Sequence, residues 1–250
     1  MTYYRMEVLR ILRDPVTMFF AAVLPAFFYL LFGARSAYGE FPLGNGNVAM
    51  YTLIAMGAYG AATATTVVGG HAALERMQGW TRQLGLTPMP DSTFVTTKVA
   101  VAWTIAAVPV IVANLLGMVT LASAPWHVWV ISALVAWAGS AIFALYGLVF
   151  GLALKSEASF SAASGSLVIL GFLGNVFMPL SGIMLDIARF TPLYGVVALA
   201  RYPLTGSQGV NLESGEAFTE PWQPMVANVV VWTIALAVLA TWLVRRARAR

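Results

Sequence analysis

The most constraining feature of this sequence is a long stretch without charge. Between Val99 and Leu154 there is no Asp, Glu, Lys or Arg. At about 1.5 Å per helical residue, this stretch is far too long for one crossing of a hydrocarbon core about 30 Å thick. We therefore expect two spanning helices, 94–122 and 128–154, joined by a turn around Ser123-Ala124-Pro125-Trp126-His127. The chain is 60% hydrophobic and only 10% charged, which also predicts an integral membrane protein.

Further apolar runs flank this hairpin. We expect them to form spans at 15–34, 48–70, 160–181 and 225–244. The fold class predicted is an all-α polytopic membrane protein with six transmembrane helices. The second span is rich in Gly, Ala and Thr, and such small residues allow helices to approach closely in lipid.

The first fourteen residues predict a helix that lies on the inner membrane surface, because Arg5, Arg10 and Arg13 alternate with apolar side chains. The alternative is a signal peptide. The apolar run that follows is longer than the roughly 7–15 residues typical of such a peptide, so an uncleaved first span is favoured.

The segment 71–91, HAALERMQGWTRQLGLTPMPD, is the longest polar interruption between the first four runs. Leu74, Met77, Trp80 and Leu84 share one helical face, and the two prolines end the helix. We interpret the segment as a cytoplasmic amphipathic helix whose charged face meets a soluble partner. The alternative for Glu75 and Arg76 is a solvated pair at the membrane surface.

A second irregular segment, 183–205, is largely apolar but contains charges and prolines. It is too broken to span, so we expect short re-entrant helices at the outer surface. Its charged residues either pair with one another or form an outer gate: Asp186, Arg189 and Arg201.

Basic residues favour one orientation. With both termini inside, Arg35, Arg189 and Arg201 lie outside, and the remaining eleven of the fourteen Lys and Arg residues lie inside. This bias follows the positive-inside rule. The excess of Arg over Lys is typical of a GC-rich bacterial source, so we expect a bacterial cytoplasmic membrane.

Several functions are disfavoured by what the sequence lacks. There is no cysteine, and the two histidines are far apart. No Gly-Lys-Ser/Thr is present for a phosphate-binding loop, so we expect no cofactor on this chain and any ATP and Mg²⁺ on a partner. The spans carry no carboxylate pair or catalytic triad, which disfavours an intramembrane enzyme. The net charge of +4 is explained by membrane orientation, so nucleic-acid binding is not expected.

The order of these elements resembles an ABC transporter type-2 permease. The segment ERMQGWTRQLGLTPMP at 75–90 resembles that family's cytoplasmic coupling segment, and MPLSGIMLDIARFTPLYGVVALAR at 178–201 resembles its span-five end and re-entrant region. The resemblance covers essentially the whole chain. It implies an exporter or flippase subunit that pairs with two copies of an ATPase subunit and with a second permease, as a homodimer or heterodimer.

The resemblance also assigns roles to individual residues. It implies that the ATPase is contacted by Glu75, Arg76, Trp80, Arg82 and Leu84. It implies that a central cavity is lined by Phe28, Tyr59, Asn114, Asn175 and Phe177. For both asparagines, however, hydrogen bonding between helices is the favoured role. The Gly147-x-x-x-Gly151 motif is expected to pack helices within the subunit. The rival function is an ATP-independent facilitator or the anchor of a signalling or assembly complex.

Overall fold

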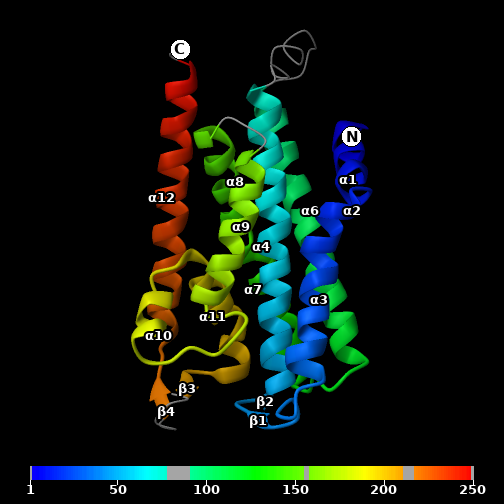
Figure 1. The fold of residues 1–250 in the computed structure, drawn as a ribbon, viewed down its shortest axis with the longest axis vertical. Coiled ribbons are helices and arrows are strands. Elements are labelled where there is room, and N and C mark those ends of the chain that lie inside the picture. Colours follow the sequence, from blue (N-terminus) through cyan, green and yellow to red (C-terminus); the bar gives the residue numbers. More distant parts are fainter. Residues whose placement is uncertain (1, 78–90, 155–157, 211–216, 249–250) are drawn as a thin grey trace.

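The structure, a computed structural model, describes residues 2–77, 91–154, 158–210 and 217–248. Helices dominate it (Figure 1): α1 (Thr2–Leu12), α2 (Pro15–Met18), α3 (Leu24–Tyr29), α4 (Val48–Met77), α6 (Asp91–Met118), α7 (Trp126–Gly139), α8 (Ala141–Leu154), α9 (Ala158–Leu173), α10 (Gly182–Ala188), α11 (Pro192–Thr205) and α12 (Trp222–Arg248). Two antiparallel hairpins pair β1 (Pro42–Leu43) with β2 (Gly46–Asn47), and β3 (Gln208–Val210) with β4 (Ala217–Thr219).

The described part of the chain contains five helices long and apolar enough to cross a membrane, or six if the α10–α11 pair counts as one span. Helices α10 and α11 are bent by 100° relative to each other, and α9 is a shorter apolar helix. These long apolar helices indicate an α-helical polytopic membrane protein, as the sequence predicts.

The bundle has two distinct ends. Helix α1 and the C-terminal end of α12 lie together at one end, which we call the N/C end (Figure 1). Both β-hairpins lie at the opposite end, which we call the hairpin end (Figure 1). Helix α1 packs its apolar side against the bundle, because Ile11 is buried in a cluster with Val68, Val101 and Ile105.

Helix α4 forms the centre of the bundle, and its apolar window is completely buried. Small residues let α8 approach it closely. A Cβ on Gly147 would lie 2.0 Å from the carbonyl oxygen of Thr66, and a Cβ on Gly69 would lie 2.0 Å from that of Ala144. The predicted close packing of 48–70, and of Gly147-x-x-x-Gly151 within the chain, is confirmed.

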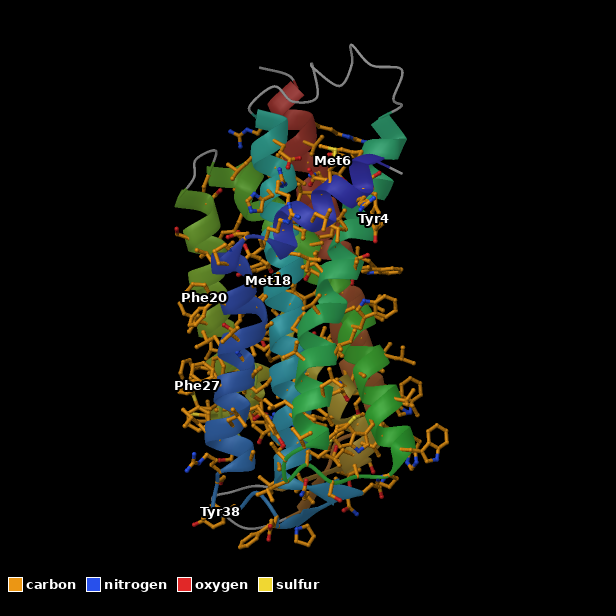
Figure 2. The ribbon with its side chains drawn as sticks, turned by 90° about the vertical axis from the view of Figure 1, so that its right-hand side faces the viewer. Tyr4, Met6, Met18, Phe20, Phe27 and Tyr38 are labelled. Atoms are coloured by element: carbon orange, nitrogen blue, oxygen red, sulfur yellow. The ribbon has the colours of Figure 1, made fainter. Side chains whose placement is uncertain are left out.

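The first span is one run of helix with two π-helical segments, η1 (Phe19–Val23) and η2 (Leu30–Ala34). Pro25 has no backbone N–H, and a π-helical turn immediately before it makes room for the proline ring. The side chains of Phe20 and Phe27 point away from the bundle (Figure 2), and each is about half exposed. This face is suited to lipid.

The first span begins at a capped turn, and this cap yields a pH prediction. Asp14 accepts hydrogen bonds from the backbone N–H of Val16 (3.1 Å) and the hydroxyl of Thr17 (2.5 Å). Partial burial raises the pKa of Asp14, but these hydrogen bonds outweigh it and hold the pKa below 3.8. Asp14→Ala is expected to lower stability by about 1 kcal/mol at neutral pH.

Because the folded-state pKa is lowered, this contribution is complete above about pH 4 and is lost as the pH falls further. Melting temperatures in detergent at several pH values measure both effects. Asp14→Asn is the control, since it keeps the cap but cannot titrate. A variant Asp14→Asn that lost stability on acidification as much as the wild type would contradict the assignment.

Helix boundaries differ from the sequence prediction at the C-terminal ends of the second and fifth runs. Helix α4 continues without a break to Met77, so residues 71–77 extend the second span instead of starting a separate helix. Ala72, Ala73, Leu74 and Glu75 are strong helix formers, which explains the continuation. Residues 78–90, the larger part of the predicted coupling helix, lie outside the described residues.

The predicted fifth span, 160–181, is wrong at its end because α9 stops at Leu173. Asn175 adopts a left-handed backbone conformation with φ of 59°, which asparagine tolerates better than most residues. Its side-chain oxygen accepts a hydrogen bond from the N–H of Leu180 (3.0 Å) and holds the following loop.

The predicted fourth span, 128–154, corresponds to one apolar span, Trp126–Leu154, with a single turn residue, Ser140, between α7 and α8. The carbonyl of Ser140 accepts a hydrogen bond from the hydroxyl of Thr65 on α4 (2.7 Å). The segment 183–205 does form two short helices, and Pro192 begins the second one after the N-cap Thr191.

Candidate functional site

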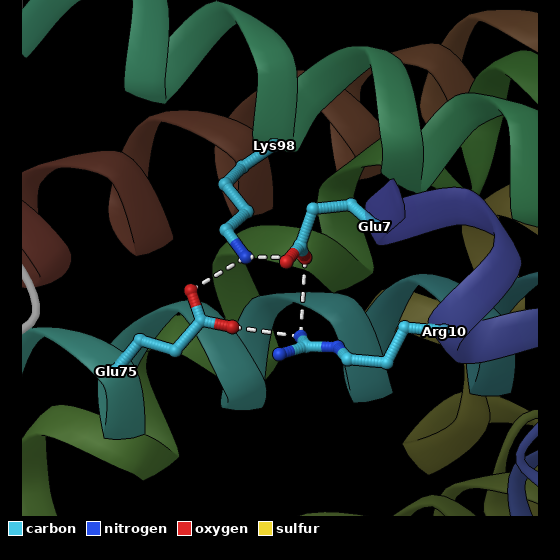
Figure 3. Close-up of polar contacts among 4 residues, drawn as sticks. All are labelled: Glu7, Arg10, Glu75 and Lys98. Atoms are coloured by element: carbon cyan, nitrogen blue, oxygen red, sulfur yellow. Dashed lines mark hydrogen bonds and ion pairs between the residues drawn. The ribbon is translucent and has the colours of Figure 1, made fainter. Parts of the chain in front are cut away.

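At the N/C end, four charged side chains from three helices form an ionic cluster: Glu7, Arg10, Glu75 and Lys98 (Figure 3). The Nζ of Lys98 lies 2.6 Å from a carboxylate oxygen of Glu7 and 2.6 Å from one of Glu75. Arg10 donates to Glu75 at 2.7 Å and to Glu7 at 3.1 Å. The contact of Lys98 with Glu75 is an ion pair without hydrogen-bond geometry. The contact of Lys98 with Glu7 is both an ion pair and a hydrogen bond.

Three of these four side chains are nearly buried. The exposed fractions are 8% for Lys98, 10% for Glu7 and 13% for Glu75, against 48% for Arg10. Two cations balance two anions, as a buried charge requires. Burial opposes the charge of Arg10, but the hydrogen bond to Glu75 and both carboxylates outweigh it and raise its pKa.

The ionic cluster joins α1 to both helices that flank 78–90. Glu7 and Arg10 come from α1, Glu75 from the last turns of α4, and Lys98 from the first turns of α6. A displacement of the segment between α4 and α6 would therefore act on three helices together.

Of the four residues in the ionic cluster, only Glu75 is among the site residues predicted from the sequence. Glu75, predicted to meet the ATPase, is bound within the chain by Arg10 and Lys98. Two sequence features mark the missing partners: Lys98 is the last charge before the charge-free stretch, and Glu7 is the first acidic residue in the chain. The remaining coupling candidates lie outside the described residues: the side chain of Arg76, and Trp80, Arg82 and Leu84.

At the hairpin end the described residues enclose a pocket of about 460 Å³. It lies between the end of the first span, the start of α4, the loop after α9, and α11. Most of its lining is aromatic or aliphatic, including Phe32, Tyr38, Phe41, Tyr51, Phe177 and Leu185. We call it the hairpin-end pocket.

The charges predicted for an outer gate separate into two sites. Asp186 and Arg189 form an ion pair (2.9 Å), and Arg189 also binds Glu220 (3.0 Å), to which Tyr194 donates a hydrogen bond. Arg201 is elsewhere, only 4% exposed and on the wall of the hairpin-end pocket. The expectation that all three predicted charges pair at the surface is therefore wrong for Arg201, because α11 buries it between α4 and the loop after α9.

Of the predicted cavity residues, three form one aromatic cluster. Phe177 packs against Tyr59 and Phe28, with ring centroids 5.0 and 5.5 Å away. Phe177 and Asn175 line the hairpin-end pocket. Asn114 lies apart, where its side chain donates to the carbonyl of Val110 (2.8 Å).

Within the described ranges, no three His, Asp or Glu side chains are grouped as a metal site would require. The ionic cluster thus links three helices at the N/C end, and the hairpin end holds a largely apolar pocket. A scan against protein-family models finds no match to this chain, and a search of curated proteins finds none either.

Proposed function

We propose that this chain is the permease subunit of an ATP-driven exporter of the ABC type-2 class. It moves an amphipathic or hydrophobic substrate out across a bacterial cytoplasmic membrane and depends on separate ATPase subunits. A dimer of permeases encloses the path. The resemblance of 75–90 and 178–201 supports the family, and the arrangement of the helices is compatible with it.

The observation that carries the proposal is the ionic cluster. A partner that pushes on 78–90 acts between Glu75 and Lys98, and these two residues are linked by an ion pair. Glu75 also binds Arg10, and Lys98 also binds Glu7, so a force on 78–90 would also reach α1. This connection would let a push on 78–90 move α1, α4 and α6 together.

The orientation of the bundle supports the same proposal. Helix α1 and the C-terminal end of α12 share the N/C end (Figure 1), and these two elements carry Arg5, Arg10, Arg245, Arg246 and Arg248. The positive-inside rule places this end in the cytoplasm, where ATP and a soluble ATPase are found. The bent α10–α11 pair then lies at the outer surface as the re-entrant segment.

The proposal predicts a partner. Purification from native membranes through a tag on this chain is expected to bring a stoichiometric soluble ATPase. Trp80→Ala is expected to weaken that association by about 2 kcal/mol, or about thirtyfold, as loss of a buried aromatic anchor does. Co-purification yield and ATPase activity measure the effect.

Trp126→Ala is the matched control, because Trp126 is an exposed tryptophan at the hairpin end, with 77% of its surface free. It should leave association unchanged. If neither Trp80→Ala nor Glu75→Gln altered assembly and coupled ATPase activity, docking at this segment would be refuted. Transport by the purified chain alone would instead favour an ATP-independent facilitator.

A further inference from the structure

The hairpin-end pocket has the dimensions of a ligand site. Its volume of about 460 Å³ lies within the roughly 300–1,000 Å³ typical of small-molecule pockets. Such sites combine an apolar lining with a few polar groups that orient the ligand. Here the aromatic lining supplies the apolar part, and the distinctive polar group is the guanidinium of Arg201.

Arg201 is held by neutral groups only. Its Nε donates to the carbonyl of Tyr51 (3.2 Å), and its Nη1 donates to the carbonyl of Asn175 (2.6 Å). The guanidinium carbon lies 3.5 Å from the centroid of the Tyr51 ring, in a stacked cation–π contact. Among the described residues no carboxylate forms an ion pair with it, and Nη2 has no acceptor.

The one carboxylate of the described pocket lining does not balance this charge. Glu220 is bound by Arg189 and by the hydroxyl of Tyr194. The guanidinium of Arg201 therefore has no carboxylate partner in the described lining. A buried cation is costly unless an anion accompanies it, and a ligand anion in the pocket would supply one.

The position of Arg201 also indicates the shape of the ligand. Arg201 lies one turn before the end of α11 at Thr205, and Tyr51 lies in the first turn of α4, so the charge sits close to the hairpin end of the bundle. The aromatic lining of Phe32 and Phe177 extends from it. An anionic head at Arg201 would leave an apolar body against these rings.

We infer that the hairpin-end pocket binds an amphipathic anion, with a single phosphate or carboxylate head at Arg201 and an apolar chain along the aromatic lining. The ligand is an anionic lipid of the membrane or a free amphiphile of the same chemistry. Binding requires only this chain, so the inference stands or falls separately from the proposed ATP-driven transport.

The test is titration of the purified full-length chain, in neutral detergent, with decyl phosphate. Binding is followed by native mass spectrometry and by the rise in melting temperature. Saturable binding is expected, and Arg201→Gln should weaken it by about tenfold or more, since the lost contact is charge-assisted. Arg35→Gln is the control at the same end and should bind as the wild type does, because Arg35 is exposed and does not line the pocket.

A second variant tests the pocket without removing the arginine. Ala198 lines the pocket, and Ala198→Phe should fill it and abolish binding while Arg201 remains. If Arg201→Gln fails to fold, Ala198→Phe alone tests whether the ligand binds in the pocket. The inference is overturned if wild-type protein shows no saturable binding, if neutral decyl maltoside competes as well as the phosphate binds, or if either pocket variant binds normally.

The two sources of the ligand are separated in nanodiscs. If phosphatidylglycerol occupies the pocket, decyl phosphate should stabilise the protein in phosphatidylcholine discs but not in discs that contain phosphatidylglycerol. Equal stabilisation in both would identify a free amphiphile as the ligand.

Discussion

Replacing Gly147 by leucine is expected to prevent or severely weaken folding of the bundle. A Cβ at this position would lie 2.0 Å from the carbonyl oxygen of Thr66 and 2.8 Å from its carbonyl carbon. Both are backbone atoms of the central helix α4 and cannot turn aside, so α8 must move away. Overpacking of this kind costs about 3 kcal/mol or more when the backbone has to shift.

The measurement is the melting temperature in detergent by size-exclusion chromatography after heating. A loss of about 3 kcal/mol corresponds to a fall of about 10 °C for a chain of this length. Gly165→Leu is the matched control, because Gly165 also lies in a helix, α9, but a Cβ there meets nothing within 4 Å. Equal melting temperatures for the two variants would show that α4 and α8 are not in close contact.

Replacing Lys98 by methionine is expected to have the second-largest effect. Lys98 lies between the carboxylates of Glu7 and Glu75, and its removal leaves these two anions with Arg10 as their remaining cation in the ionic cluster. Breaking a buried ion pair by removing one partner costs about 3–5 kcal/mol. We expect Lys98→Met to lower the melting temperature and, in the complex with an ATPase, to uncouple ATP hydrolysis from transport.

A double-mutant cycle separates the lost charge from lost packing. Glu7→Gln with Lys98→Met removes one charge of each sign and should recover much of the stability, with a coupling energy in the range of about 0.5–3 kcal/mol. Asp186→Asn is the comparison at the hairpin end. That side chain is 67% exposed, so the loss of its ion pair should cost less than about 1 kcal/mol. A Lys98→Met variant as stable as Asp186→Asn would exclude a structural role for the ionic cluster.

The sequence predicted the long helices well because their signal is local. The charge-free stretch determines a hairpin, and small residues in 48–70 indicate close packing whatever their partner is. The end of α9 was harder, since residues up to Met178 remain apolar while the turn depends on the left-handed backbone of Asn175. A hydrophobicity pattern does not predict such a turn.

The sites were less predictable because they depend on which helices become neighbours. Glu7 and Lys98 are far apart in sequence, and only the packing of α1 on α6 brings them together. Arg201 was grouped with Asp186 and Arg189 because all three are charged and close in the chain. The apolar neighbours Val197, Ala200 and Leu204, all buried in the structure, were the available sign that this arginine points inward.

Helix α4 gives the two ends of the protein a common axis. It contains 30 residues, which makes it about 45 Å long, and it is unbroken from Val48 to Met77. Glu75 near one end takes part in the ionic cluster, and Tyr51 near the other end holds the guanidinium of Arg201. If α4 rotates as a rigid body, a small rotation imposed at Glu75 would turn the Tyr51 ring and carbonyl through the same angle. The arginine that they hold would then be repositioned without a relay of side chains in between.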